Sequence, residues 1–211
     1  MNRNESRRYF SEDELVQIRR SVESAESGTS GEISTMVVDQ SDFYLEAELL
    51  GSVLSASLVA FAVALVSHHI AIWSYVPMVF LLYFPCRFIF KRFPHLKLPF
   101  VNKRRMVHAV RDRAVRAFYE KGLYKTRDET GVLIFISLFE RKVWILGDRG
   151  INARIAPHRW HEMAGRLARG IKEGRGAEAL CSVVAECGAE LSAHFPRRSY
   201  DTNELSDEVI R

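Results

Sequence analysis

One stretch of the chain, residues 49–86, runs for 38 positions without an Asp, Glu, Lys or Arg. A helix at the surface of a soluble protein needs a polar face toward water, so this pattern indicates a membrane instead. Because a bilayer span takes about 20 apolar residues, we expect two transmembrane helices, at residues 44–66 and 71–90, with a turn at 67–70. The alternative is a helical hairpin buried in a soluble domain, but the rest of the chain is too small to bury one.

The chain before this hairpin predicts one helix and one strand. Apolar residues recur at helical spacing over residues 12–27, directly after a capping-box pair formed by Ser11 and Glu14. Residues 32–38 form a short, mostly apolar run between a glycine and an aspartate, which is typical of a strand.

The chain after the hairpin predicts three helices and two strands. An amphipathic pattern covers residues 103–121, and similar patterns cover 157–173 and 177–194. The sequence GVLIFISL at residues 131–138 is apolar at nearly every position, as expected for a central strand. Residues 142–146 form its hairpin partner after a short turn.

Neither soluble segment has enough apolar residues to fold alone. We therefore expect residues 11–42 and 103–196 to form one split α/β domain, a small sheet with helices on both faces. The transmembrane hairpin at residues 44–90 is then an insertion into this domain, and residues 197–211 form a polar C-terminal tail.

Positive charge predicts the orientation of the hairpin. Residues 87–127 contain 13 Lys and Arg but only Asp112 and Glu120 as acids, and Lys and Arg beside membrane spans stay in the cytoplasm. We therefore expect both termini in the cytoplasm. We also expect no signal peptide, because the first 20 residues are polar and charged. The residues expected to contact an anionic leaflet are Lys91, Arg92, Lys97, Lys103, Arg104 and Arg105.

Several classes of function are excluded or disfavoured. A net charge of +4 is too small to indicate a nucleic-acid partner. The chain has no phosphate-binding loop of the Gly-x-x-x-x-Gly-Lys-Ser/Thr type and no Cys-x5-Arg phosphatase motif. Its three cysteines form no Cys-x-x-Cys pair, which argues against a zinc ribbon, and their odd number in a cytoplasm-facing protein argues against a disulfide framework.

The order of several short motifs resembles the TPM domain. They are SGEI at residues 30–33, TGVLI at 130–134, ERKV at 140–143 and GDRGI at 147–151, with Trp160, HFP at 194–196 and NEL at 203–205. Together they are most similar to a bacterial membrane branch of this family, whose members carry a transmembrane hairpin after the first strand. A thylakoid-lumen protein with acid-phosphatase-like activity is a more distant member.

The resemblance implies an α/β/α sandwich. With the two predicted spans, we expect the protein to be anchored in the bacterial inner (plasma) membrane. The resemblance also implies acid-phosphatase-like activity in some relatives and calcium binding in others. Metal-assisted hydrolysis needs carboxylates that converge on a cation, and the candidates here are Asp128, Glu129 and Asp148. Glu129 stands where many relatives have Asp, and Ala156 replaces a further acidic residue of the family pattern.

The antiparallel hairpin places Glu129 and Asp148 at the same end of the sheet, so a site for Ca²⁺ or another divalent cation is geometrically allowed. The alternative is that both are turn or cap residues. Two functions therefore stay open. One is a membrane-anchored, cytoplasm-facing module for interaction, assembly or maintenance of membrane proteins, with a membrane protein as partner. The other is a metal-dependent, acid-phosphatase-like hydrolase at the membrane surface.

Overall fold

The computed structural model describes residues 5–67, 72–126, 128–197 and 207–210. The expected turn after Ser67 and the motif at 203–205 lie outside these residues. The chain forms two compact units. One is Phe43–Met106, and the other joins the residues before Phe43 to those after Met106.

The second unit is built around a three-stranded sheet in the order β1-β2-β3. The strands are β1 (Glu32–Val38), β2 (Gly131–Ser137) and β3 (Lys142–Gly147). β1 runs parallel to β2, and β3 runs antiparallel to it. Every residue of β2 is buried, which explains why this strand lacks the polar alternation of a strand with one wet face.

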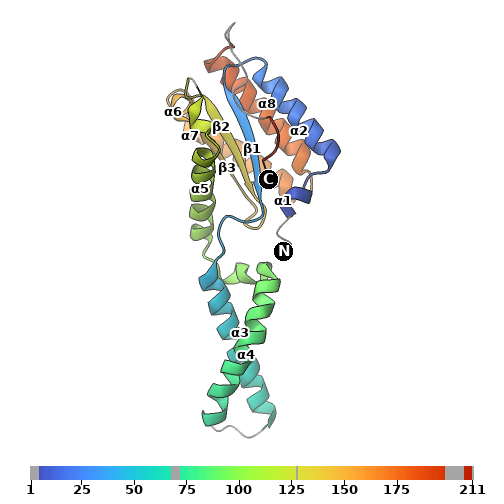
Figure 1. Ribbon diagram of the computed structural model, residues 1–211, viewed down its shortest axis with the longest axis vertical. Helices are drawn as coiled ribbons and strands as arrows, with labels where there is room; N and C mark the ends of the chain where they lie inside the picture. The colour runs from blue at the N-terminus through green and yellow to red at the C-terminus, as the bar shows by residue number, and fades with distance from the viewer. Residues whose placement is uncertain (1–4, 68–71, 127, 198–206, 211) are drawn as a thin grey trace. The chain divides into compact units, whose positions relative to one another are not determined.

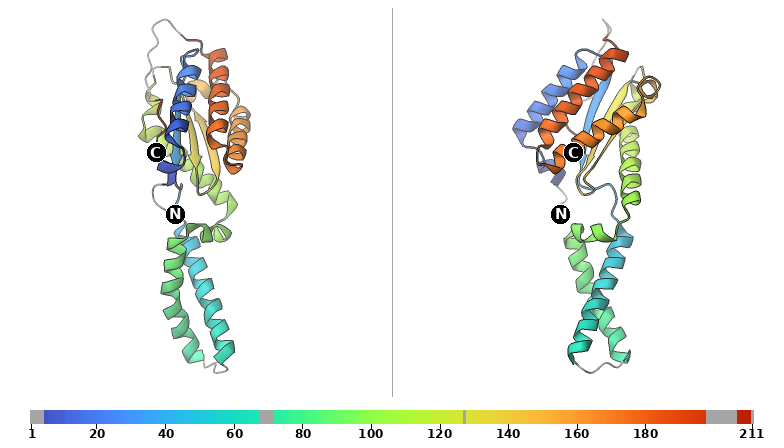
Figure 2. Two further views of the ribbon diagram at one scale, coloured as in Figure 1. Left: turned by 90° about the vertical axis from the view of Figure 1, so that its right-hand side faces the viewer. Right: turned by 180° about the vertical axis from the view of Figure 1, so that it is seen from behind.

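Helices cover both faces of the sheet (Figure 1). One face packs against α2 (Glu12–Glu26), α7 (Pro157–Lys172) and α8 (Gly176–His194), around a core that includes Ile18 and Ile134. The other face packs against α5 (Lys103–Glu120) through a separate apolar cluster. Figure 2 shows the same layers from two further directions. The α/β/α sandwich expected from the sequence is confirmed.

The helices begin and end close to where the sequence predicts them. Ser11 caps α2, accepting a hydrogen bond from the Glu14 backbone N–H, and the Glu14 side chain accepts one from Ser11 in return. The remaining short elements are α1 (Glu5–Arg8), η2 (Leu123–Lys125) and α6 (Arg149–Asn152).

The two outer edges of the sheet differ. Ile210 extends the β1 edge, since its N–H donates to Thr35 O at 2.9 Å and Val37 N–H donates to Ile210 O at 2.9 Å. The sequence predicts only a polar tail over residues 197–211 and gives no sign of this pairing. No strand among the described residues pairs with the outer edge of β3.

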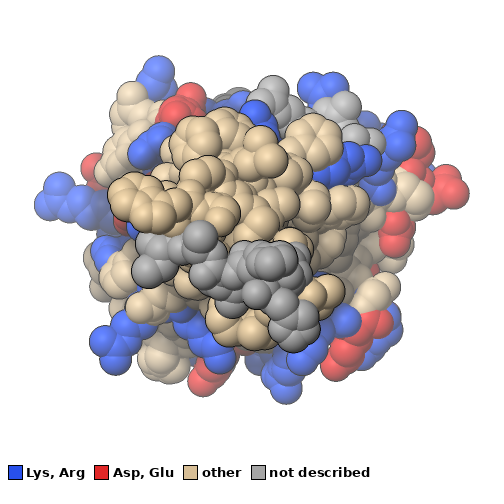
Figure 3. Space-filling model, turned by 90° about the horizontal axis from the view of Figure 1, so that it is seen from below, with Lys and Arg blue, Asp and Glu red and all other residues tan. Residues whose placement is uncertain are grey.

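The first unit is a helical hairpin of α3 (Leu45–Ser67) and α4 (Ile72–Arg92), followed by the short helix η1 (Pro94–Phe100). Both helices are long and apolar enough to cross a membrane. Large apolar side chains lie exposed along them, with Trp73 90% and Val66 81% accessible. Figure 3 shows the uncharged character of this surface as a field of tan side chains. The two helices match the predicted spans at 44–66 and 71–90.

Candidate functional site

The candidate site lies at the end of the sheet where β1 and β2 begin and β3 ends. Glu32 N–H donates to Thr130 O at 3.1 Å, which joins the first residue of β1 to the residue before β2. Asp148 N–H donates to Gly131 O at 2.8 Å, which joins the residue after β3 to the first residue of β2. The strand pairing predicted from the sequence therefore brings Asp148 to the start of β2.

Asp148 also caps the short helix α6. Its Oδ1 accepts a hydrogen bond from Arg149 N–H at 2.7 Å, and its backbone carbonyl accepts one from Asn152 N–H at 2.9 Å. Its Oδ2 is buried and has no hydrogen-bond partner among the described residues. A buried carboxylate oxygen without a donor is costly, so this atom needs a partner that the described chain does not provide.

Residues 128–129 lie directly against the loop after β3. A Cβ added to Gly150 would lie 2.7 Å from Glu129 O and 2.8 Å from Asp128 O. Glu129 itself adopts a left-handed backbone conformation, with φ of 54°, which is uncommon for a residue with a side chain. The two segments therefore approach each other through their backbones, and glycine at position 150 permits the approach.

The three predicted metal ligands are close in the fold, but their side chains differ in surroundings. Asp128 and Glu129 are exposed, whereas Asp148 is half-buried. In the described part of the chain, no group of three or more His, Cys, Asp or Glu side chains could hold a metal ion. Metal binding by these three residues stays a prediction.

A further acidic residue, Glu26, lies at the same end of the sheet and was not predicted from the sequence as part of a site. Glu26 Oε1 accepts a hydrogen bond from Ile33 N–H at 2.6 Å. Burial, opposed by this hydrogen bond and assisted by the charges of Glu32 and Asp207, raises the pKa of Glu26 to about 8. Glu26 is therefore protonated at neutral pH. The sequence shows only that Glu26 and Glu32 flank a Gly-Thr-Ser-Gly turn, and burial of Glu26 is visible only in the fold.

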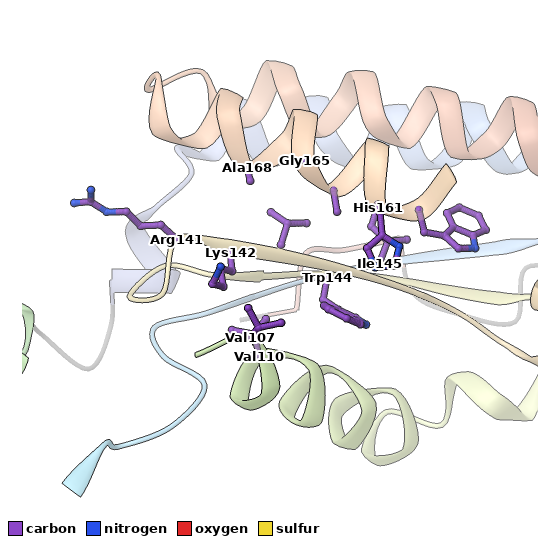
Figure 4. A pocket seen from close by; sticks show the side chains of 12 residues that line it. Val107, Val110, Arg141, Lys142, Trp144, Ile145, His161, Gly165 and Ala168 are labelled. Carbon is purple, nitrogen blue, oxygen red and sulfur yellow. The ribbon is translucent and has the colours of Figure 1, made fainter. Parts of the chain in front are cut away.

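A hollow of about 240 Å³ lies along the outer edge of β3, between α5 and α7. In Figure 4, Trp144 points toward α5, while His161, Gly165 and Ala168 line the hollow from α7. The rings of Trp144 and His161 meet edge to face, with centroids 5.8 Å apart. Lys142 and Arg141 also line the hollow, so it is apolar with a basic end.

The residues expected at the membrane surface divide into two groups. Lys91 and Arg92, at the end of α4, are exposed, as are Lys103 and Arg104. Lys97 is only 8% accessible, and its Nζ lies 2.7 Å from Glu48 Oε2. Arg105 forms an ion pair with Glu46. The ammonium group of Lys97 is thus engaged within the hairpin unit, and contact of these six residues with lipid stays a prediction.

The comparisons with known proteins agree with the family resemblance. The family model of the TPM domain matches residues 101–190. Among solved structures, the chain is similar to the NMR structure of the BA42 protein from the psychrophilic bacterium Bizionia argentinensis, with a TM-score of 0.59 and 18% identity. That similarity covers 95% of this chain and 94% of BA42, and at this identity it shows the fold alone. No curated protein matches the chain.

The first prediction compares two glycines. Gly150→Ala should lower the free energy of unfolding by about 1–3 kcal/mol, because the new methyl group would meet backbone oxygens that no side-chain rotation can move. Gly165→Ala should raise it by about 0.5–1 kcal/mol, because a Cβ there meets nothing within 4 Å and alanine favours the helix. Chemical denaturation measures both. Equal effects of the two substitutions would contradict the close approach at Gly150.

The second prediction concerns Glu26. Its pKa is raised on folding, so its contribution to stability is fully present below its unfolded pKa of about 4.3 and is lost as pH rises through about 8. Glu26→Gln keeps the acceptor for Ile33 N–H and removes the ionisation. Relative to wild type, it should therefore gain about 1–2 kcal/mol between pH 5 and pH 8.5, after a discount for partial exposure.

Thermal melts at several pH values measure this difference. Glu23→Gln, at an exposed position on the same helix, is the matched control and should follow the wild-type pH profile. Parallel profiles of Glu26→Gln and wild type between pH 5 and pH 8.5 would contradict the raised pKa.

Proposed function

We propose that the chain is a membrane-anchored TPM domain that faces the cytoplasm and serves as a module for interaction, assembly or maintenance of membrane proteins. The observation that carries the proposal is the pair of apolar helices α3 and α4, whose side chains lie largely exposed. Transfer of a fully exposed apolar side chain from water to lipid is favourable by roughly 1.5–3 kcal/mol, so a surface of this kind favours a bilayer over water.

The charge pattern supports the proposed orientation. The basic residues cluster after the second helix, where Lys91 and Arg92 end α4. Lys and Arg beside a span are retained on the cytoplasmic side. Because both ends of a two-helix hairpin emerge on the same side of a membrane, the sandwich assembled from the residues before α3 and after α4 then faces the cytoplasm.

An interaction role is favoured by the surface of the sandwich. The outer edge of β3 carries no strand from the described residues, and an apolar hollow with a basic end runs along it. An open sheet edge beside a hollow is a common place for a protein to receive a segment of another chain.

The third prediction tests the anchor and its orientation. In cells that express the full chain, the protein should stay in the membrane fraction after alkaline carbonate extraction. A cysteine at position 69 (His69→Cys) should react with a membrane-impermeant maleimide in intact cells. A cysteine at position 208 (Glu208→Cys) should react only after lysis. The wild type, with its three native cysteines, gives the background. Extraction into the soluble fraction, or labelling of position 208 in intact cells, would overturn the proposal.

A second candidate function is a metal-dependent, acid-phosphatase-like hydrolase. One observation favours it, namely the buried Oδ2 of Asp148 without a hydrogen-bond partner in the described chain. The backbone of residues 128–129 lies beside the same loop. Carboxylate and backbone carbonyl oxygens are the ligands that Ca²⁺ and Mg²⁺ prefer. A divalent cation held by Asp148 would there polarise a phosphoryl oxygen.

The fourth prediction tests this candidate on the full chain in detergent. If Asp148 binds a cation, millimolar Ca²⁺ should raise the melting temperature, because a ligand that binds only the folded state stabilises it. Asp148→Asn should abolish that gain while keeping the cap of α6, since Asn also caps helices. Glu162→Gln, on the exposed start of α7, is the control and should keep the gain. A wild type that ignores Ca²⁺, Mg²⁺ and Mn²⁺ would eliminate the metal site.

A further inference from the structure

The hydrogen-bonding groups on the outer edge of β3 can be assigned from the register of the sheet. Backbone pairs along an antiparallel ladder alternate between hydrogen-bonded and non-hydrogen-bonded. Asp148 N–H donates to Gly131 O, so Asp148 and Gly131 form a hydrogen-bonded pair, and the alternation along the rest of the ladder follows from it. Trp144, opposite Phe135, then belongs to a hydrogen-bonded pair, whereas Val143 and Ile145 do not. The backbone groups of Val143 and Ile145 consequently point away from β2.

These outward groups are the ones that a further strand would use. The chain closes the opposite edge of the sheet itself, because Ile210 pairs with β1 through two backbone hydrogen bonds. At the β3 edge, the described residues offer no such strand. Within the described chain, the sheet is thus completed on one side and left open on the other.

The walls of the hollow leave room for a strand. On the α7 side, the lining residues are small, namely Ala164, Gly165 and Ala168. A Cβ added at Gly165 would meet nothing within 4 Å. On the α5 side, Val107 and Val110 supply an apolar wall. The volume of about 240 Å³ is below the roughly 300–1,000 Å³ of small-molecule sites. It suits the few side chains that one face of a short strand presents.

The basic residues that line the hollow indicate the charge of the partner that would bind there. Arg141 and Lys142 line one end, and neither forms an ion pair with an acidic side chain of the described residues. The lining contains no Asp or Glu among the described residues. Trp160 also lines the hollow, and its buried Nε1–H has no acceptor in the described part of the chain.

We propose that the outer edge of β3 binds an extended, acidic peptide segment of a partner protein, which pairs as a fourth strand. This proposal rests on the proposed interaction function and names its docking site. The segment's backbone pairs with Val143 and Ile145, its apolar side chains enter the hollow, and its carboxylates lie near Arg141 and Lys142. A preference for acidic segments distinguishes this site from an edge that is only protected against pairing, where lysine serves to repel other strands.

The test uses the full chain in nanodiscs of zwitterionic lipid, so that lipid charge does not compete. The probe is a fluorescein-labelled peptide of about nine residues that alternates Val and Glu, because alternation places all Val side chains on one face of the strand and all Glu side chains on the other. A Val/Lys peptide of the same length tests charge. A Val/Glu peptide with N-methylated central residues tests backbone pairing. Fluorescence anisotropy should show binding of the first peptide and at least tenfold weaker binding of the other two.

Two variants test the location. Gly165→Leu fills the hollow without disturbing the helix and should weaken binding at least tenfold. Gln17→Leu, at an exposed position of α2, adds the same side chain elsewhere and should bind as wild type does. Lys142→Glu should reverse the preference toward the Val/Lys peptide. At saturation, hydrogen exchange at the amides of Val143 and Ile145 should slow about tenfold, while the Trp144 amide, already paired with β2, should not change.

The outcomes separate the two proposals. Protein that fails to elute with the nanodiscs contradicts the membrane anchor. Protein that elutes with them but binds no peptide, binds equally after Gly165→Leu, or prefers neither charge overturns the docking site alone. Amides of Val143 and Ile145 that are already protected in the free protein would also overturn it, because a segment of the chain itself would then cover the edge.

Discussion

The parallel pairing of β1 with β2 is the constraint on which the rest of the chain depends. Parallel neighbours cannot be joined by a tight turn, so the chain must leave the end of β1 and return to the start of β2 at the opposite end of the sheet. In this protein the connection runs from residue 39 to residue 130 and holds the apolar hairpin and α5. Loop-closure entropy grows only slowly with length, so an inserted unit costs the sheet little.

The same pairing determines which elements the sequence could predict. Local patterns were sufficient for β2, whose burial on both faces leaves an unbroken apolar run, and for α2, whose capping box marks its first turn. The two apolar helices were equally clear, because an uncharged run of this length is typical of membrane spans and rare in soluble helices. The predicted boundaries of these elements agree with the structure to within one or two residues, and β1, expected at residues 32–38, agrees at both ends.

What the sequence could not show depends on contacts between distant residues. Nothing local indicates that Ile210 pairs with β1, because one apolar pair in a polar tail is a weak strand signal. Glu26 is an ordinary helix-terminal acid until the fold buries it beside Glu32 and Asp207. At the candidate metal site, the hairpin register led to the expectation that Glu129 and Asp148 lie at the same end of the sheet, and binding of a cation there stays a prediction. The register could not predict that residues 128–129 approach the loop after β3 through backbone atoms at Gly150, with the side chains of Asp128 and Glu129 exposed.

Anchoring and strand docking would reinforce each other in physical terms. A fourth strand on the β3 edge would form a few backbone hydrogen bonds, each worth a net ~0.5–1.5 kcal/mol, and would fill a hollow of about 240 Å³. After the cost of ordering an extended peptide, such an interface is weak in free solution. Confinement of both partners to one membrane raises their effective concentration, as a short linker does between two binding modules. A shallow edge site is therefore better suited to an anchored domain than to a freely diffusing one.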